Sequence, residues 1–307
     1  GERKLITLMM QMDADIVLMT MPDLNHYHIK RSYIRKDIEY IFIPHGVDSS
    51  NLMMRYGSMD AFDTIFSATK SQTEEAEKTR ELHKLKGQKV VEIGSPILDD
   101  MIKNYSKHKQ KGTRILIAPS WQEENIIDLC LKKMLEILGE QKDFSVVLRP
   151  HPQQVRHQPE RFSMMAKKYK DTNIEIQTDF SSNETVMEAD VLITDWSAIA
   201  YEYAFTTMRP VLFIDTPMKV MNQKYEELGI EPFNVAIREK IGLRLKPDEI
   251  SEIDKRLRDL LKNSQRYQKI IQEIRDEEIY HLGQSGEVAG KYIVESIQAK
   301  IKERSKK

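Results

Sequence analysis

The chain has 307 residues, 40% hydrophobic and 31% charged, which is enough for two domains that each bury a core. Lys and Arg number 47 against 48 Asp and Glu, and this balance excludes the strong basic field of a general nucleic-acid binder. Cys130 is the only cysteine, which excludes an intramolecular disulfide and a multi-cysteine metal site. The helical pattern around Cys130 predicts that its side chain is buried.

Short apolar runs bounded by turn residues alternate with charged segments of helical period. The runs predict strands at 15–19, 38–43, 64–67, 90–93, 114–118, 145–148, 174–177, 191–194, 211–214 and 242–245. The periodic segments predict helices at 72–86, 125–138, 161–169 and 199–206, and a charged helical region from 251 onward. Several strands are apolar throughout, as parallel strands covered on both faces are. We therefore expect an α/β fold of two doubly wound, Rossmann-like domains that face a cleft.

A polar, basic stretch without apolar periodicity, residues 104–113, is the expected linker between the domains. It divides a first domain, residues 1–108, from a second, residues 109–285. A last helix within residues 286–307 could pack back on the first domain. The first residue is Gly rather than Met, so we expect the chain to begin inside a longer protein and the first domain to be truncated.

Polar side chains follow three of the predicted strands at their carboxyl ends, where open parallel sheets bind ligands. The three sets are His45 with Gly46, Arg149 with His151, and Asp195 with Ser197. Each set alone has an ordinary structural interpretation, as a loop residue, a surface ion pair or a helix cap. Their shared position at strand ends, in both halves of the chain, predicts a site in the cleft.

The residue types suit phosphate chemistry. Ser197 and the backbone N–H groups that start the following helix would hold an anion, and Arg149 offers a planar guanidinium to phosphate oxygens. A histidine with a pKa near neutrality suits deprotonation of an attacking hydroxyl. Glu202, farther along the same helix, could reach a ribose diol, although a solvated helix residue accounts for it equally well.

Lys30, Arg31 and Ser32 are candidate contacts to a phosphate-bearing substrate, with a solvated loop as the alternative. His26 and His28 have no third ligand at a supporting spacing, so we expect no metal site. The sequence contains no Walker loop, Gly-x-Gly-x-x-Gly, His-Glu-x-x-His or Gly-x-Ser-x-Gly motif. Their absence argues against P-loop NTPases, Rossmann dehydrogenases, zincins and α/β-hydrolases.

Taken together, these segments resemble the CDP-glycerol:poly(glycerophosphate) glycerophosphotransferase family, bacterial enzymes that build teichoic acids and related polyol-phosphate polymers. The resemblance rests on Pro44-His45-Gly46, Arg149-Pro150-His151-Pro152, Thr194-Asp195-Trp196-Ser197 and Tyr201-Glu202-Tyr203-Ala204, with further matches at 29–32, 61–63, 93–96 and 283–286. It extends from about residue 15 to residue 301. It implies a GT-B-like fold with an acceptor-side first domain and a second domain that holds the nucleotide donor.

The resemblance also implies roles for single residues. His45 resembles the histidine proposed as the base toward the acceptor hydroxyl, and His151 with Arg149 resembles the pair at the pyrophosphate. Asp195 and Ser197 match a Thr-Asp-Tyr-Ser-Ser segment near the donor phosphates. This sequence departs from that segment with Trp196 for Tyr and Ala198 for the second Ser, so one phosphate hydroxyl is lost and a different donor becomes conceivable.

The expected function is transfer of glycerol phosphate, or a related polyol phosphate, from a CDP-polyol to an acceptor hydroxyl, with release of CMP. The expected partners are this donor and a lipid-linked or polymeric polyol-phosphate or glycan acceptor, without nucleic acid and without a cofactor or metal. The expected location is the cytoplasmic face of the bacterial inner membrane, with the chain peripheral or anchored through a segment absent from it. The basic end, residues 300–307, is either solvated or a contact to anionic lipid.

Two alternatives stay open. One is a GT-B glycosyltransferase that uses a nucleotide sugar for capsule or surface polysaccharide, in which the same histidine would act as base toward an anomeric carbon. The other is a catalytically inert domain that binds a nucleotide or a polymer. The identity of the donor separates the first alternative from phosphotransfer, and the retained strand-end histidines argue against the second.

Overall fold

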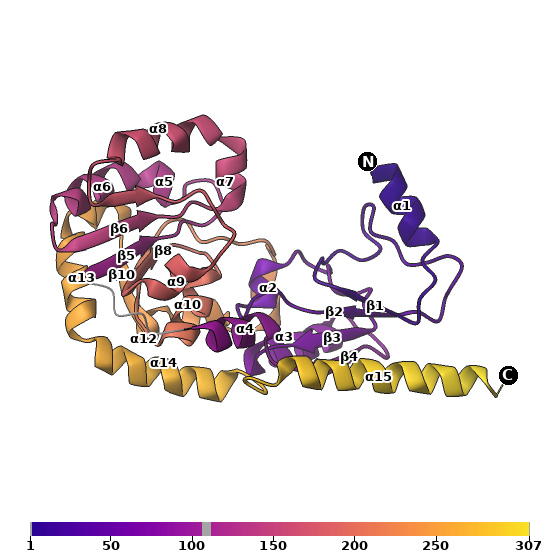
Figure 1. Cartoon of the computed structure of the whole chain (residues 1–307). Coiled ribbons are helices and arrows are strands. Elements are labelled where there is room, and N and C mark those ends of the chain that lie inside the picture. Colours follow the sequence, from indigo (N-terminus) through magenta and orange to yellow (C-terminus); the bar gives the residue numbers. More distant parts are fainter. Residues whose placement is uncertain (1, 106–111, 307) are drawn as a thin grey trace. The chain divides into compact units, whose positions relative to one another are not determined.

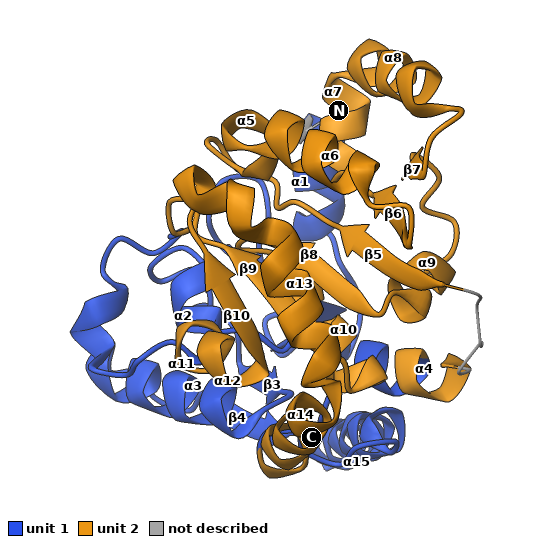
Figure 2. Cartoon of the chain, turned by 90° about the vertical axis from the view of Figure 1, so that its left-hand side faces the viewer, with its two compact units in different colours: residues 1–100, 220–233, 278–307 blue, residues 101–219, 234–277 orange. Residues whose placement is uncertain are grey.

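The computed structural model describes residues 2–105 and 112–306, and the chain divides into two compact units (Figure 2). Unit 1 contains residues 1–100, 220–233 and 278–307, and unit 2 contains residues 101–219 and 234–277. Both units are therefore built from separated stretches of sequence. The expected boundary between residues 108 and 109, and most of the expected linker, lie outside the described residues.

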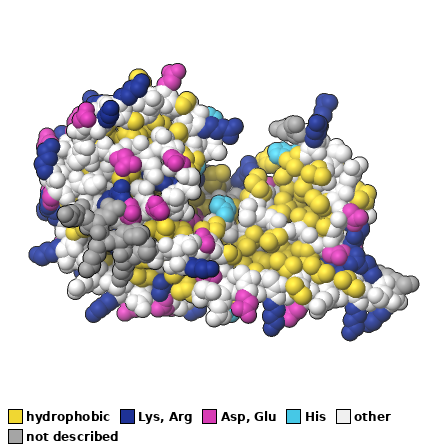
Figure 3. All heavy atoms as spheres, viewed as in Figure 1, with side chains coloured by type: hydrophobic (Ala, Val, Ile, Leu, Met, Phe, Trp, Pro, Cys, Tyr) yellow, Lys and Arg dark blue, Asp and Glu magenta, His cyan; other side chains and the backbone are white. Residues whose placement is uncertain are grey.

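Unit 1 contains a four-stranded parallel sheet in the order β1-β2-β3-β4 (Figure 1). The strands are β1 (Ile16–Met19), β2 (Glu39–Phe42), β3 (Thr64–Ser67) and β4 (Lys89–Glu92). The helices are α1 (Glu2–Met10), α2 (Ser50–Met53), α3 (Lys70–Leu82), the 3-10 helix η1 (Tyr225–Leu228) and α15 (Ser285–Arg304). The strand β1 pairs with β2 alone, and its Leu18 is 44% exposed. Figure 3 shows hydrophobic side chains gathered at the surface over this unit.

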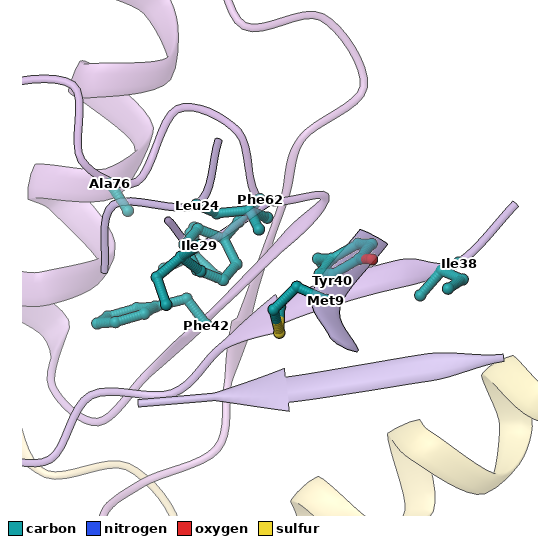
Figure 4. Packing of buried hydrophobic residues seen from close by; sticks show 9 residues of the cluster. Met9, Leu24, Ile29, Ile38, Tyr40, Phe42, Phe62 and Ala76 are labelled. Carbon is teal, nitrogen blue, oxygen red and sulfur yellow. The ribbon is translucent and has the colours of Figure 1, made fainter. Parts of the chain in front are cut away.

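The two faces of this sheet bury separate hydrophobic clusters. One cluster contains Met9, Leu24, Ile29, Ile38, Tyr40, Phe42, Phe62, Ile65 and Ala76 (Figure 4). The other joins Ile41, Phe66 and Ile93 to Ala289 of α15. Successive residues of β2 enter opposite clusters because strand side chains alternate between faces. The helix α15 therefore packs on the sheet of unit 1. It corresponds to the last helix predicted from the sequence, which could pack back on the first domain.

A tight contact leads the chain into α15. Gly94 has a φ of +87°, and a Cβ built there would lie 2.2 Å from the carbonyl oxygen of Tyr280. The carboxylate of Asp99 accepts hydrogen bonds from the backbone N–H groups of Gly283 and Ser285, at 2.6 and 2.9 Å. The segments 93–96 and 283–286, both noted in the sequence, thus pack together inside unit 1.

Unit 2 contains a six-stranded parallel sheet in the order β10-β9-β8-β5-β6-β7. Its strands are β5 (Thr113–Ile117), β6 (Phe144–Leu148), β7 (Ile174–Ile176), β8 (Val191–Thr194), β9 (Val211–Ile214) and β10 (Gly242–Leu245). The chain runs outward from β5 to β7, then returns to β8 on the other side of β5. The switch point, where doubly wound sheets bind ligands, therefore lies between the carboxyl ends of β5 and β8.

The helices of unit 2 follow the same alternation with strands. They are α5 (Ile126–Leu129), α6 (Leu131–Glu140), α7 (Pro152–His157), α8 (Pro159–Tyr169), α9 (Glu184–Glu188), α10 (Ile199–Thr207), α12 (Arg238–Ile241), the 3-10 helix η2 (Pro247–Glu252), α13 (Ile253–Lys262) and α14 (Ser264–Glu278). Two further helices, α4 (Pro96–Asn104) and α11 (Phe233–Ala236), cross between the units. Within the described ranges, no helix is both long and apolar enough to cross a membrane.

The α/β class with two parallel sheets is confirmed, and each predicted strand has a counterpart in the structure. The single helix predicted at 125–138 is wrong in one respect, because the chain breaks into α5 and α6 at Cys130. The backbone of Cys130 leaves the helical region, with φ −146° and ψ −3°. Its side chain is buried, as predicted. The helix α1 was not predicted.

Candidate active site

The loop after β2 carries His45 and Gly46 and is held by a buried side chain of α3. Gln72 donates from its amide nitrogen to the carbonyl oxygens of Gly46 and Asp48, at 3.0 and 2.9 Å. Its amide oxygen accepts from the backbone N–H of Ala68 at 2.9 Å. The backbone on which His45 stands is thus fixed, while the His45 side chain is exposed.

A buried carboxyl, Glu75, continues this support one turn along α3. It accepts hydrogen bonds from the hydroxyl of Ser49 at 2.5 Å and from the backbone N–H of Asn51 at 2.9 Å. Ser49 in turn caps α2 by accepting from the N–H of Leu52. Burial, together with the smaller effect of the nearby charge of Asp48, raises the pKa of Glu75 to about 7 against the hydrogen bonds that lower it. Glu75 is a residue that the sequence analysis missed.

His151 occupies the N-cap position of α7, directly after β6. The ring Nδ1 accepts a hydrogen bond from the backbone N–H of Gln153 at 3.2 Å. The backbone N–H of His151 donates to the side-chain oxygen of Gln154 at 3.0 Å. Burial lowers the pKa of His151 from its ordinary value of 6.5, and the positive charge of Lys219 adds to this effect. A neutral ring with Nδ1 accepting carries its proton on Nε2. His151 can therefore donate from Nε2 to an anionic oxygen.

Arg149, which also follows β6, is engaged by the segment after β7. Its guanidinium donates to the side chain of Gln177 at 3.1 Å and to the carbonyl oxygen of Ser182 at 3.0 Å. A longer contact of 3.4 Å reaches Asn183, and the guanidinium lies 5.2 Å from the ring centroid of Phe180. The cation predicted to bind phosphate thus holds a neighbouring loop in this structure.

Asp195 is 1% exposed and acts on the protein's own backbone. One carboxylate oxygen accepts from the N–H of Ser120 at 2.7 Å and the other from the N–H of Ile126 at 3.3 Å. These two donors lie at the two ends of the loop after β5. Asp195 therefore ties the loops of β5 and β8 together at the switch point.

Ser197 and Ala198 lie just before α10, whose first turn also contains Glu202. The N-terminus of α10 has no side-chain cap, and Ser197 and Glu202 are half-buried. Uncapped N–H groups and the helix dipole favour an anion at such a position. The anion site expected at this helix start therefore stays a prediction, with which the uncapped N-terminus of α10 is compatible.

A buried cation, Arg238, supports this segment from α12. It donates to the carbonyl oxygen of Asp195 at 2.8 Å and to the carboxylate of Asp215 at 3.1 Å. Its guanidinium lies 3.9 Å from the ring centroid of Trp196, whose indole N–H donates to the carbonyl of Thr216 at 2.9 Å. The sequence did not single out Arg238, because its partners Asp195, Trp196 and Asp215 lie in other segments of the chain.

In unit 1, Arg31 and Ser32 have structural partners. Arg31 forms a bidentate ion pair with Asp63, at 2.8 and 3.1 Å. Ser32 is buried, and its hydroxyl donates to the carbonyl of Met12 at 2.7 Å. Lys30 donates to a carbonyl within its own loop. The fold thus accounts for Arg31 and Ser32 without a substrate.

The candidate residues therefore group by unit. Those of unit 2, which are Arg149, His151, Asp195, Ser197 and Glu202, follow β6 and β8, the two strands that flank β5, while His45 and Gly46 follow β2 in unit 1. Among the residues that the structure describes, no group of three or more His, Cys, Asp or Glu is placed to hold a metal ion.

Comparisons with known proteins show which sequences and folds the chain is similar to. The chain is 24% identical over 191 residues to the teichoic acid glycerol-phosphate primase of Bacillus subtilis (strain 168), covering 58% of this chain and 48% of that relative. This chain thus spans about half the length of the curated relative. A variant of the wall teichoic acid polymerase TagF has a similar fold, with a TM-score of 0.59, 17% identity, and coverage of 96% of this chain and 75% of that one.

A second similar structure, S. aureus MnaA with UDP, has a TM-score of 0.58 and 16% identity, and covers 93% of this chain and 78% of that one. At these identities the solved structures support the GT-B-like fold alone. The family model described as CDP-glycerol:poly(glycerophosphate) glycerophosphotransferase matches residues 35–279, well over half of the sequence. The chain therefore belongs to the CDP-glycerol:poly(glycerophosphate) glycerophosphotransferase family.

Proposed function

We propose that this chain transfers glycerol phosphate, or a related polyol phosphate, from a CDP-polyol to an acceptor hydroxyl and releases CMP. The observation that carries the proposal is the family match over residues 35–279, which encloses His45, His151 and Ser197. The H444N variant of the related polymerase TagF has a solved structure with CDPG, obtained by a soak. The product would be a bacterial cell-surface polymer, made at the cytoplasmic face of the membrane.

In the proposed reaction, the acceptor oxygen attacks the β-phosphorus of the donor, and the bond from that phosphorus to the bridging oxygen breaks. His45 takes the proton of the acceptor hydroxyl, and the electron pair of the broken bond leaves with CMP. The exposure of His45 on a loop anchored by Gln72 supports this role, because a base must reach a diffusing hydroxyl yet keep its position.

The residues of unit 2 would stabilise the leaving phosphate. His151 offers a donor at Nε2, and Ser197 stands before the uncapped N-terminus of α10. Such preorganised donors supply most of the catalysis in phosphoryl transfer. In this scheme Asp195 and Arg149 would position the site, since their contacts hold the loops around His151 and Ser197.

Nucleotide release from a panel of donors tests the proposal. The purified chain is incubated with CDP-glycerol, CDP-ribitol, CMP-sugars and UDP-sugars in the presence of a polyol-phosphate acceptor. We expect CMP from a CDP-polyol, and a fall in turnover of about 10²–10⁴ in His45→Ala if the imidazole is the general base. His151→Ala should also lose turnover, whereas His26→Ala, an exposed histidine of another loop, is the matched control.

Two results would contradict the proposal. Release of nucleotide only from sugar donors would keep the fold but change the reaction to glycosyl transfer. Full turnover in His45→Ala would remove that residue from the mechanism.

A further inference from the structure

A pocket in unit 2 is lined by residues that have no assigned role in the reaction proposed above. It has a volume of about 430 Å³ and lies among the loop after β5 and the helices α5, α7 and α8. Figure 2 shows these three helices along one side of the unit. A volume of this size falls in the range of small-ligand sites.

Three of the side chains that line this pocket are apolar, and one of the three is a tryptophan. Phe162 of α8 and Ile127 of α5 are buried residues that line it. Trp121 stands at the wall and is 40% exposed. The indole ring is nearly parallel to the ring of His157, with the centroids 5.5 Å apart. An indole held in place by a neighbouring ring offers a flat apolar surface at little entropic cost.

The other side chains that line the pocket are polar, and they carry planar amide, carboxylate and guanidinium groups. Arg161 donates to the side-chain oxygen of Gln158 at 2.8 Å and lies 3.9 Å from the carboxylate of Asp128. Glu123 adds a second carboxylate to the lining. One cation faces two anions, so the net charge of the lining disfavours a phosphate and favours an uncharged ligand.

The loop that carries Trp121 is fixed at both ends. Asp195 holds the N–H groups of Ser120 and Ile126, as described above. Between them Glu124 adopts a left-handed conformation with φ +52°, which a non-glycine residue keeps only where its surroundings impose it. The pocket is therefore preformed by the same carboxylate that organises the switch point.

We propose that this pocket binds an uncharged sugar unit of the acceptor. An apolar ring face suits the indole of Trp121, the amide groups can donate to and accept from hydroxyls, and the carboxylates can accept from them. The rings of Trp121 and His151 lie 6.2 Å apart between centroids, so the sugar would lie beside the candidate donor-binding histidine. The assignment of this sugar to the acceptor rests on the proposed function. The binding of a sugar in the pocket does not, because it requires no turnover.

Nuclear magnetic resonance of the two tryptophan indole N–H groups tests this proposal on the intact chain. The chain has two tryptophans, and the spectrum of Trp121→Phe assigns their signals. The probes are methyl β-glucoside and methyl N-acetyl-β-glucosaminide, with glycerol 3-phosphate and CMP as anionic comparisons. We expect the glycosides to shift the Trp121 signal saturably, with a Kd of the order of 1 mM, while the Trp196 signal stays in place.

Variants separate this pocket from adventitious binding. Trp121→Ala should weaken glycoside binding at least about tenfold, measured by saturation transfer to the ligand. Met164→Ala, an exposed apolar residue of α8, should leave binding unchanged. Asp128→Asn should not strengthen glycoside binding, although it would strengthen the binding of an anion. Unchanged circular dichroism of each variant shows that the fold is intact.

Three results would overturn the proposal. They are no glycoside shift at ligand concentrations far above the expected Kd, glycoside binding that survives Trp121→Ala, and a Trp121 shift with CMP or glycerol 3-phosphate in place of the glycosides. Failure here with CMP release intact would leave the proposed function standing. Glycoside binding without CMP release from any donor would support the pocket and count against the reaction.

Discussion

The buried carboxyl of Glu75 should make unit 1 less stable as the pH rises. A glutamate ionises at about 4.5 when solvated, and burial raises the pKa of Glu75 to about 7. Between these two values the unfolded chain releases the proton and the folded chain keeps it, so stability falls with rising pH. Each tenfold change in the acid constant is worth about 1.4 kcal/mol, so the loss is of the order of 3 kcal/mol.

The substitution Glu75→Gln should remove this loss. An amide can accept from the N–H of Asn51 through its oxygen and donate from its nitrogen to the hydroxyl of Ser49, as the protonated acid would. Compared with the wild type, we therefore expect the variant to have similar stability near pH 4.5 and higher stability above pH 7. The difference above pH 7 should be about 3 kcal/mol.

Urea unfolding at several pH values between 4.5 and 8, followed by far-ultraviolet circular dichroism, measures this difference. Trp121 and Trp196 both belong to unit 2, so their fluorescence reports on the unit that lacks the substitution. A parallel decline of the wild type and Glu75→Gln with pH would refute the reasoning. So would a variant that is destabilised at every pH, because the amide would then fail to replace the acid.

Two further predictions concern the path into α15 and the charge of a candidate residue. Gly94→Ala should lower the melting temperature of the chain far more than Gly87→Ala. Both glycines have a positive φ, but only at Gly94 would a Cβ press against the carbonyl of Tyr280. Equal effects of the two substitutions in a thermal melt would show that backbone strain alone matters. Lys219→Met should raise the pKa of His151, since a positive charge that disfavours the imidazolium is removed. A titration of the His151 ring proton by nuclear magnetic resonance measures this change, and an unchanged or lower pKa would contradict it.

The strands were predictable because their signal is local. The run Val191–Thr194 is apolar, short and bounded by turn residues, and it forms a buried central strand. The break at Cys130 was not predictable, because the apolar period continues across it. The make-up of unit 1 was hidden for a related reason. The segment 220–233 joins it through contacts such as the N–H of Met221 to the carbonyl of Leu52 at 3.1 Å, between positions far apart in the sequence.

The candidate site shows the same limit. Asp195 and Ser197 are near neighbours in sequence and looked alike as strand-end polar residues. In the structure, the carboxylate of Asp195 accepts hydrogen bonds from backbone N–H groups of the loop after β5, whereas Ser197 is half-buried just before a helix. Arg31 was a candidate substrate contact in the sequence, and in the structure it forms an ion pair with Asp63. A sequence shows which side chains could do chemistry, but their partners come from other elements.

The division of unit 1 between distant segments affects how the protein is made. A ribosome delivers the strands of unit 1 well before α15, which covers one face of their sheet. At roughly 5–20 residues per second, this apolar face waits on the order of tens of seconds for its cover. The strands of unit 1 are thus fully enclosed only after those of unit 2 have been synthesised, and in the meantime their apolar face is a surface that a chaperone would cover.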